Sequence, residues 1–178
     1  MEIILAENHG FCYGVKRAVE MANEAADGKG KSYTLGPIIH NPQVVGRLES
    51  KGVSPIQEVA DIDEGTMIIR SHGVGPAIYA EAEEKGLHIL DATCPHVKKA
   101  QQDAKSVIED GMTLVILGEK NHPEVKSINL WANNKGIIIE DEESAQKLQI
   151  VEKMGVVVQT TFSQFKFNSI IDILEKKS

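Results

Sequence analysis

Residues 11–18 read FCYGVKRA and residues 93–100 read TCPHVKKA, so Cys, Val, Lys and Ala recur in the same order. A second pair of segments, LGPIIHNPQVV at 35–45 and LGEKNHPEV at 117–125, shares Leu, Gly and His. Both pairs are separated by 82 positions along the chain. Two generic α/β units would resemble each other only weakly and would not keep a Cys and a His in register. The common separation therefore predicts an internal duplication.

The duplication places reactive side chains at matching points of the two halves. Cys12 matches Cys94 and His40 matches His122, and 28 positions separate the Cys from the His in each half. We therefore expect a first α/β repeat over residues 1–92 and a second over residues 93–178.

Between these motifs, short apolar segments bounded by Gly, Asp or Asn alternate with helical patterns, several of which begin with Pro. Near-continuous apolar strands that alternate with helices are typical of a parallel sheet covered on both faces. The sequence thus predicts an α/β fold of two tandem repeat units with mostly parallel sheets. The expected strands are Ile3–Leu5, Ser32–Leu35, Thr66–Arg70, His88–Leu90, Thr113–Leu117, Gly136–Ile139 and Gly155–Gln159. The expected helices are Gly14–Ala26, Asn41–Lys51, Pro76–Lys85, Pro95–Glu109, Pro123–Ala132, Glu143–Leu148 and Ser163–Lys176.

The composition narrows the class of protein. The 178 residues suffice for a hydrophobic core, and 19 basic against 26 acidic side chains give a net charge of −7. That balance disfavours non-specific binding to nucleic acid or to a membrane surface. No apolar run approaches the roughly 20 residues of a membrane span, and the first residues lack the pattern of a signal peptide. We expect a cytoplasmic protein whose two cysteines form no disulfide.

The two cysteines precede expected helices, where the positive end of the helix dipole favours a thiolate. Thiolates in this position suit metal or cluster ligation, or nucleophilic catalysis. A single Cys is more often a small buried apolar residue, but that interpretation does not explain two at equivalent positions. Zinc ligation is a weaker alternative because neither Cys12 nor Cys94 has a second Cys three positions away. A nucleophile requires only one Cys, so it leaves the duplication unexplained.

Three of the six histidines fall at the expected carboxyl ends of strands, where open α/β sheets bind their ligands. His40 and His122 each come just before a helix, whose free backbone N–H groups favour anions, and His72 lies on a glycine-containing turn. A lone His at such a point is usually a capping or surface residue. Three together predict an anion site, and we interpret His9, His88 and His96 as structural or peripheral.

Glu124, Thr160 and Thr161 allow more ordinary interpretations. Glu124 lies in the first turn of an expected helix, where a carboxylate commonly offsets the helix dipole. The two threonines follow an apolar strand, as β-branched residues often do, although their hydroxyl groups could also serve in a proton relay. This strand end matches Ser71 and His72 of the first half at a separation of 89 positions, which implies an insertion of about seven residues.

Taken together, these motifs resemble the LytB (IspH) family of isoprenoid biosynthesis, the 4-hydroxy-3-methylbut-2-enyl diphosphate reductases. The resemblance extends over nearly the whole chain, with the motifs in the order in which the family has them. The matching segments are GFCYGVKRA at 10–18, LGPIIHNPQVV at 35–45, IRSHGV at 69–74, DATCPHVKKA at 91–100, HPEV at 122–125 and QTT at 159–161.

The resemblance implies reductive dehydroxylation of an allylic diphosphate to isopentenyl and dimethylallyl diphosphates, with electrons from a ferredoxin- or flavodoxin-like donor. It also implies a 4Fe-4S cluster on three thiolates, one from each of three repeats, with one iron open to the substrate. By resemblance, two of these thiolates belong to Cys12 and Cys94, and the diphosphate is bound by His40, His72 and His122. Glu124 matches the proton donor, and Thr160 matches a hydroxyl group near the substrate.

The repeat spacing also predicts what this chain lacks. Cys94 follows His72 by 22 positions, whereas the 17 residues after the matching Thr161 contain no Cys. We therefore expect the third unit of the family fold to be missing from this sequence, with its cluster ligand and its diphosphate-binding Ser and Asn residues. Faces that would contact it should then be exposed and cause self-association. The alternative function is a non-catalytic diphosphate-binding or interaction fragment.

Overall fold

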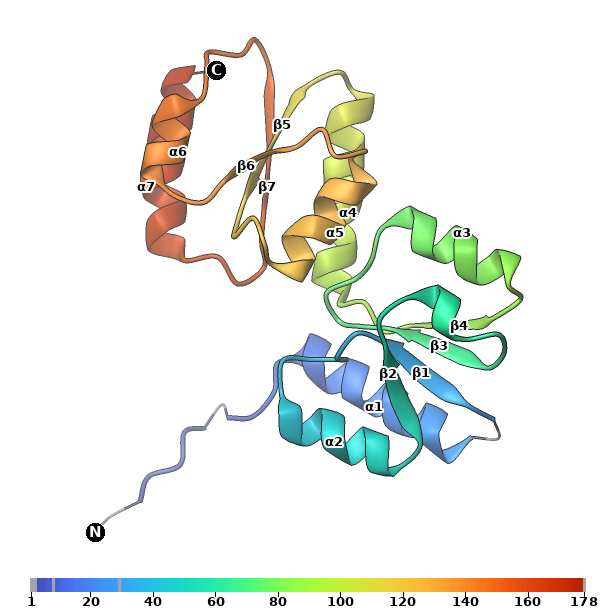
Figure 1. Ribbon diagram of the computed structural model, residues 1–178. Helices are drawn as coiled ribbons and strands as arrows, with labels where there is room; N and C mark the ends of the chain where they lie inside the picture. The colour runs from blue at the N-terminus through green and yellow to red at the C-terminus, as the bar shows by residue number, and fades with distance from the viewer. Residues whose placement is uncertain (1–2, 8, 29, 178) are drawn as a thin grey trace.

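The computed structural model describes residues 3–7, 9–28 and 30–177. Two parallel sheets, each flanked by helices, lie one after the other along the molecule (Figure 1). The first half contains α1 (Tyr13–Asp27), β1 (Ser32–Leu35), α2 (Pro42–Ser50), β2 (Val53–Ile56), a 3-10 helix (Val59–Asp61), β3 (Thr66–Ile69), α3 (Pro76–Glu84) and β4 (His88–Asp91). The second half contains α4 (Pro95–Glu109), β5 (Thr113–Leu117), α5 (Pro123–Trp131), β6 (Ile137–Ile139), α6 (Glu142–Lys147), β7 (Met154–Val158), α7 (Gln164–Leu174) and a 3-10 helix (Glu175–Lys177).

The two sheets have the same core topology. The first has the strand order β2-β1-β3-β4 and the second has the order β6-β5-β7, and every pairing is parallel. β5 therefore lies between β6 and β7, just as β1 lies between β2 and β3. The expected α/β class with parallel sheets is confirmed. The proposed division at residues 92 and 93, which falls between β4 and α4, stays a prediction.

The central strands are apolar throughout because helices cover both of their faces. In β3, Ile68 packs in a cluster with residues of α1 and α2, whereas Met67 and Ile69 pack on the other side, in the cluster that includes Ala82 of α3. In β5 the residues alternate in the same way between a cluster with α4 and α5 and a cluster with α6 and α7. All four residues 114–117 have no exposed side-chain surface.

One expected strand was wrong, and one strand was not predicted. Residues Ile3–Leu5 form no strand, and their side chains are 76–83% exposed on a segment that extends away from the first sheet (Figure 1). Apolar β-branched residues do not form a strand without a neighbouring strand edge to pair with. The structure also contains β2, which was not predicted because Ser54 and Pro55 interrupt its apolar pattern. Pro55 is tolerated because β2 is an edge strand that pairs only with β1.

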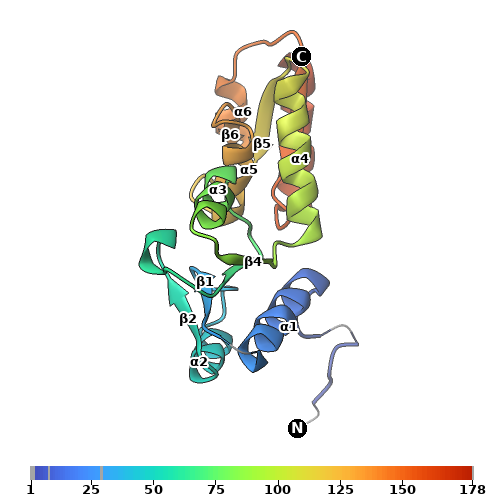
Figure 2. The same cartoon turned by 90° about the vertical axis from the view of Figure 1, so that its right-hand side faces the viewer.

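Hydrogen bonds between the two halves fix their relative position. The Arg17 guanidinium donates to the Thr93 carbonyl at 3.3 Å, and the Trp131 indole N–H donates to the Val74 carbonyl at 2.9 Å. Trp131 also packs edge-on against Tyr79, with ring centroids 6.0 Å apart. Figure 2 shows β4 running directly into α4 at this junction. Within the described ranges, no helix is both long and apolar enough to cross a bilayer.

Candidate functional site

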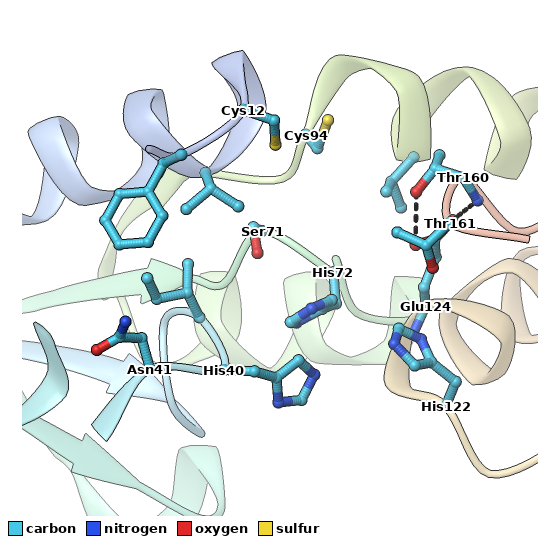
Figure 3. A pocket seen from close by; sticks show the side chains of 14 residues that line it. Cys12, His40, Asn41, Ser71, His72, Cys94, His122, Glu124, Thr160 and Thr161 are labelled. Carbon is cyan, nitrogen blue, oxygen red and sulfur yellow. Dashed lines mark hydrogen bonds between the residues drawn. The ribbon is translucent and has the colours of Figure 1, made fainter. Parts of the chain in front are cut away.

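All seven side chains singled out from the sequence line one pocket of about 320 Å³ between the two halves (Figure 3). The thiols lie along one side of the pocket and the three imidazole rings along the other. Glu124 lies in the first turn of α5, Cys12 directly precedes α1, and the other five lie on loops that follow strands, so the carboxyl ends of the strands build most of the site. The seven residues are Cys12, His40, His72, Cys94, His122, Glu124 and Thr160.

Cys12 and Cys94 are free thiols at the N-cap positions directly before α1 and α4. Cys94 donates its backbone N–H to the Ser71 carbonyl at 2.9 Å, which ties α4 to the end of β3. Its sulfur lies against Gly14, where an added Cβ atom would be only 2.5 Å from Cys94 Sγ. The absence of a side chain at Gly14 thus lets the Cys94 thiol approach the start of α1, where Cys12 is located.

These thiols supply part of the ligand set of an iron–sulfur cluster, since Fe–S clusters are held by cysteine side chains. Cys12 is exposed and Cys94 is half-buried beside the pocket, so both can reach an inserted group. The sequence contains two cysteines in all, whereas ferredoxin-type clusters usually have four thiolate ligands.

The three histidines form a close triangle. Their ring centroids are 4.5 Å apart for His40 and His72, 5.5 Å for His72 and His122, and 5.8 Å for His40 and His122. One nitrogen from each ring lies within 4.8 Å of those of the other two. Such a triangle can surround either a metal ion or a phosphate group.

Hydrogen bonding favours an anion over a metal ion at this triangle. The Nδ1 atom of His122 accepts the Glu124 backbone N–H at 3.2 Å, so the proton of a neutral His122 ring is on Nε2. A ring with this tautomer donates a hydrogen bond from Nε2, whereas a metal ion would require that nitrogen to be deprotonated. Nδ1 of His72 is buried and has no hydrogen-bond partner among the described residues.

His72 is the histidine with the most perturbed protonation. Burial, and to a lesser extent the charges of His40, His122 and Arg70, together lower its pKa from 6.5 to about 4. The neutral ring is therefore favoured at pH 7 when no anion is bound. An anion placed among the three rings would favour protonation and gain charge-assisted hydrogen bonds.

Glu124 and Thr160 form a buried pair at the pocket wall. Glu124 is 2% exposed; its Oε1 accepts the Thr160 backbone N–H at 2.6 Å, and its Oε2 is 2.9 Å from the Thr160 hydroxyl. The hydroxyl can donate to a carboxylate or accept from a carboxylic acid. Both protonation states of Glu124 are thus compatible with the same geometry, as a proton donor requires.

Two further pocket residues, Asn41 and Ser71, were not selected from the sequence. The Asn41 side chain caps α2 by accepting the Val44 N–H, which the Asn-Pro pair at 41–42 could have indicated. Ser71 is buried, and its hydroxyl donates to the Ile38 carbonyl at 3.2 Å. Both position the strand ends that carry His40 and His72. The remaining histidines, His9, His88 and His96, do not line the pocket.

Comparison with known proteins gives a consistent result. A sequence model of the family described as LytB protein matches residues 3–178. The 4-hydroxy-3-methylbut-2-enyl diphosphate reductase of Geotalea uraniireducens is 49% identical over 172 residues, which are 97% of this chain and 61% of that protein. The enzyme of the same name from Geobacter metallireducens is 50% identical over 163 residues, 92% of this chain and 58% of its own length. The chain thus spans about three fifths of these curated relatives.

Two solved structures share the fold. One is described as the E-1-hydroxy-2-methyl-but-2-enyl-4-diphosphate reductase from Plasmodium falciparum, with a TM-score of 0.90 at 32% identity over 96% of this chain and 55% of that chain. The other is described as (E)-4-hydroxy-3-methyl-but-2-enyl diphosphate reductase, the terminal enzyme of the non-mevalonate pathway. It has a TM-score of 0.87 at 43% identity over 98% of this chain and 64% of that chain.

Proposed function

The chain belongs to the LytB family, and from that premise we propose that its pocket is most of the active site of a 4-hydroxy-3-methylbut-2-enyl diphosphate reductase. The reaction consumes two electrons and two protons: one proton leaves with the substrate hydroxyl group as water, and the other is added to the allylic carbon skeleton, giving isopentenyl or dimethylallyl diphosphate. The observation that carries the proposal is the buried Glu124–Thr160 pair, which lines the same pocket as three histidines and two thiols. The electrons would come from a ferredoxin- or flavodoxin-like donor in the cytoplasm.

The histidine triangle binds the diphosphate in this proposal. His122 donates from Nε2 because its Nδ1 atom is held by the Glu124 N–H. His72 is protonated as the anion enters, because the negative charge offsets the burial that otherwise keeps the ring neutral. His40 is exposed at the rim, where it can meet the incoming ligand.

Glu124 supplies the proton with which the hydroxyl group leaves. Its carboxyl group lines the pocket, and Thr160 orients it through the backbone N–H at 2.6 Å and the hydroxyl at 2.9 Å. Because the Thr160 hydroxyl can reverse its hydrogen bond, it holds Glu124 in place before and after proton transfer. Burial of Glu124 beneath the pocket wall also limits exchange of that proton with bulk water.

Cys12 and Cys94 would hold a 4Fe-4S cluster at the other side of the pocket. When bound, such a cluster delivers electrons to the substrate and offers an open iron as a Lewis acid for the hydroxyl oxygen. Gly14 and the Cys94–Ser71 hydrogen bond place the Cys94 thiol for this role. With two cysteines in residues 1–178, a third thiolate ligand would come from elsewhere.

The alternative function is a non-catalytic module that binds a diphosphate or another protein. The two can be separated by purifying the chain anaerobically, reconstituting it with iron and sulfide, and measuring iron content and electron paramagnetic resonance. The reductase proposal predicts cluster signals that Cys12→Ser and Cys94→Ser abolish and that Glu124→Gln preserves. Absence of iron together with measurable diphosphate binding in calorimetry would support the alternative, and zinc in place of iron would contradict both the cluster and its proposed ligands.

A further inference from the structure

A second pocket of about 350 Å³ adjoins the histidine pocket and shares no residue with it. The turn after β3 separates the two, because Arg70 and Gly73 line the second pocket whereas Ser71 and His72 line the first. We call the second pocket the Arg70 groove. It is bounded by the ends of β1 and β3, by the loop before α3, and by one side of α5.

The position of the Arg70 groove in the sheet is one where α/β proteins bind ligands. The groove lies at the ends of the neighbouring strands β1 and β3. The chain passes from β1 to β2 on one side of this pair, and from β3 to β4 on the other side. The crevice between the carboxyl ends of two such strands is the topological switch point of the sheet. Gly36 follows β1 directly and Arg70 follows β3 directly, so both lie at this point.

The charge of the groove is opposite to that of the chain. Arg70 and Lys126 line it and no acidic side chain does, although the chain carries a net charge of −7. Among the described residues, neither cation forms an ion pair or a side-chain hydrogen bond. The Arg70 Nε atom is buried without a partner, and burial lowers the pKa of the guanidinium. A half-buried, unpaired guanidinium is costly unless an anion completes its hydrogen bonds.

The backbone makes room for this cation. Gly36 has a φ angle of +69°, and a Cβ atom there would lie 2.8 Å from Arg70 Nη1. A side chain at position 36 would therefore be strained and would displace the guanidinium. The remaining wall is largely apolar and includes Leu35, Val74 and Leu130. The groove thus combines two cations, Arg70 at the end of β3 and Lys126 on α5, with an apolar surface.

We propose that the Arg70 groove is a second ligand site, which binds a small phosphorylated molecule carrying a short apolar group. The guanidinium is a planar fork that can donate two parallel hydrogen bonds to a phosphate, and Lys126 adds a second positive charge. The apolar group would lie on Leu35, Val74 and Leu130. This inference does not depend on the proposed reductase function, because none of the groove residues belongs to the histidine pocket.

Phenyl phosphate is a suitable probe, with inorganic phosphate and benzyl alcohol as its polar and apolar fragments. The chain contains a single tryptophan, Trp131, whose neighbour Leu130 lines the groove and whose indole N–H is bonded to Val74. Its fluorescence should therefore change when the groove fills. We expect phenyl phosphate to bind more tightly than either fragment.

Substitutions distinguish the groove from the histidine pocket. Arg70→Met should weaken phenyl phosphate binding about tenfold or more, since hydrogen bonds to charged groups contribute about 1.5–3 kcal/mol. Lys126→Met should weaken it roughly two- to fivefold, as expected for an exposed charge. The matched control Arg47→Met, on the remote exposed face of α2, should leave it unchanged. His40→Ala should weaken binding of diphosphate to the first pocket and leave the Trp131 response intact.

Arg70→Lys provides a second variant that keeps the charge but loses the fork, and it should weaken binding less than Arg70→Met. Circular dichroism checks that each variant is folded. If Arg70→Met does not fold, Arg70→Lys and Lys126→Met decide the question between them. Equal affinity in all arginine and lysine variants, or loss of the Trp131 response in His40→Ala alone, would overturn the proposal.

Discussion

Replacing Gly14 by Ala is the substitution that most directly probes how the two thiols are brought together. Gly14 lies in the first turn of α1, and an alanine Cβ there would be 2.5 Å from Cys94 Sγ and 3.1 Å from Cys94 Cβ. Real Cβ atoms do not approach so closely, so the Cys94 thiol would have to rotate away and α4 would have to shift by a few tenths of an ångström. Gly46 is the matched control, because it lies within helix α2 and an added Cβ would meet nothing within 4 Å.

The two substitutions should change the free energy of unfolding in opposite directions. Replacing Gly by Ala inside a helix usually gains about 0.5–1 kcal/mol, which is the gain we expect for Gly46→Ala. At Gly14 the overpacking cost of about 1–3 kcal/mol exceeds that gain, so we expect a net loss of about 1 kcal/mol. The difference between the two variants should therefore be about 1.5–2 kcal/mol.

Urea unfolding under reducing conditions, followed by far-ultraviolet circular dichroism, measures this difference. A double-mutant cycle with Cys94→Ala identifies its cause, because removing the sulfur should relieve the clash and make Gly14→Ala less harmful. A Gly14→Ala variant as stable as Gly46→Ala, or a cycle with no coupling between positions 14 and 94, would refute the close approach of Cys94 to α1.

Other predictions concern the buried network, the pH dependence and the exposed surface. Ser127→Ala should lower the free energy of unfolding by about 1–3 kcal/mol, since it leaves the buried Gln101 amide without the partner at 3.0 Å. The control Ser106→Ala, at an exposed position of α4, should change it by less than about 0.5 kcal/mol. Because the pKa of His72 is lowered from 6.5 to about 4 in the folded state, its contribution to stability should be complete above pH 6.5 and be lost as the pH falls toward 4. His72→Gln should flatten that part of the stability profile, and an unchanged profile would show that His72 titrates normally. Large apolar side chains such as Phe11, Tyr13 and Phe165 are 48–80% exposed, so sedimentation velocity should show concentration-dependent self-association rather than a monomer at every concentration.

The residues of the first pocket could be selected from the sequence because parallel strands bring their carboxyl ends to one edge. The strands before His40 and His72 pair in one sheet, and those before His122 and Thr160 pair in the other, so strand order alone brings each pair together. The meeting of the two pairs depends on how the two halves pack. Glu124 needed the family resemblance as well, since a carboxylate in the first turn of a helix is ordinary. Its buried contact with Thr160 is a tertiary feature that no local pattern reveals.

The features that could not be predicted depend on where side chains point. The Arg70 groove exists because Arg70 and His72, two residues apart at the end of β3, line different pockets. The close approach of Cys94 to Gly14 likewise depends on how α1 and α4 pack. Residues Ile3–Leu5 are a case in which the sequence predicts too much. Their composition is typical of a strand, but they have no neighbouring strand with which to pair.

The reductase proposal is tested most directly by a chimera in which residues 1–178 are followed by the remaining two fifths of the Geotalea uraniireducens reductase, which is 49% identical over the matched part. Iron content and turnover of 4-hydroxy-3-methylbut-2-enyl diphosphate are measured anaerobically with a chemical reductant. We expect one cluster per chimera and turnover, loss of the cluster in Cys12→Ser and in Cys94→Ser, and loss of turnover with the cluster retained in Glu124→Gln. A chimera that carries the cluster without turnover, or that keeps both in the Cys variants, would contradict the assignment of this pocket as the active site.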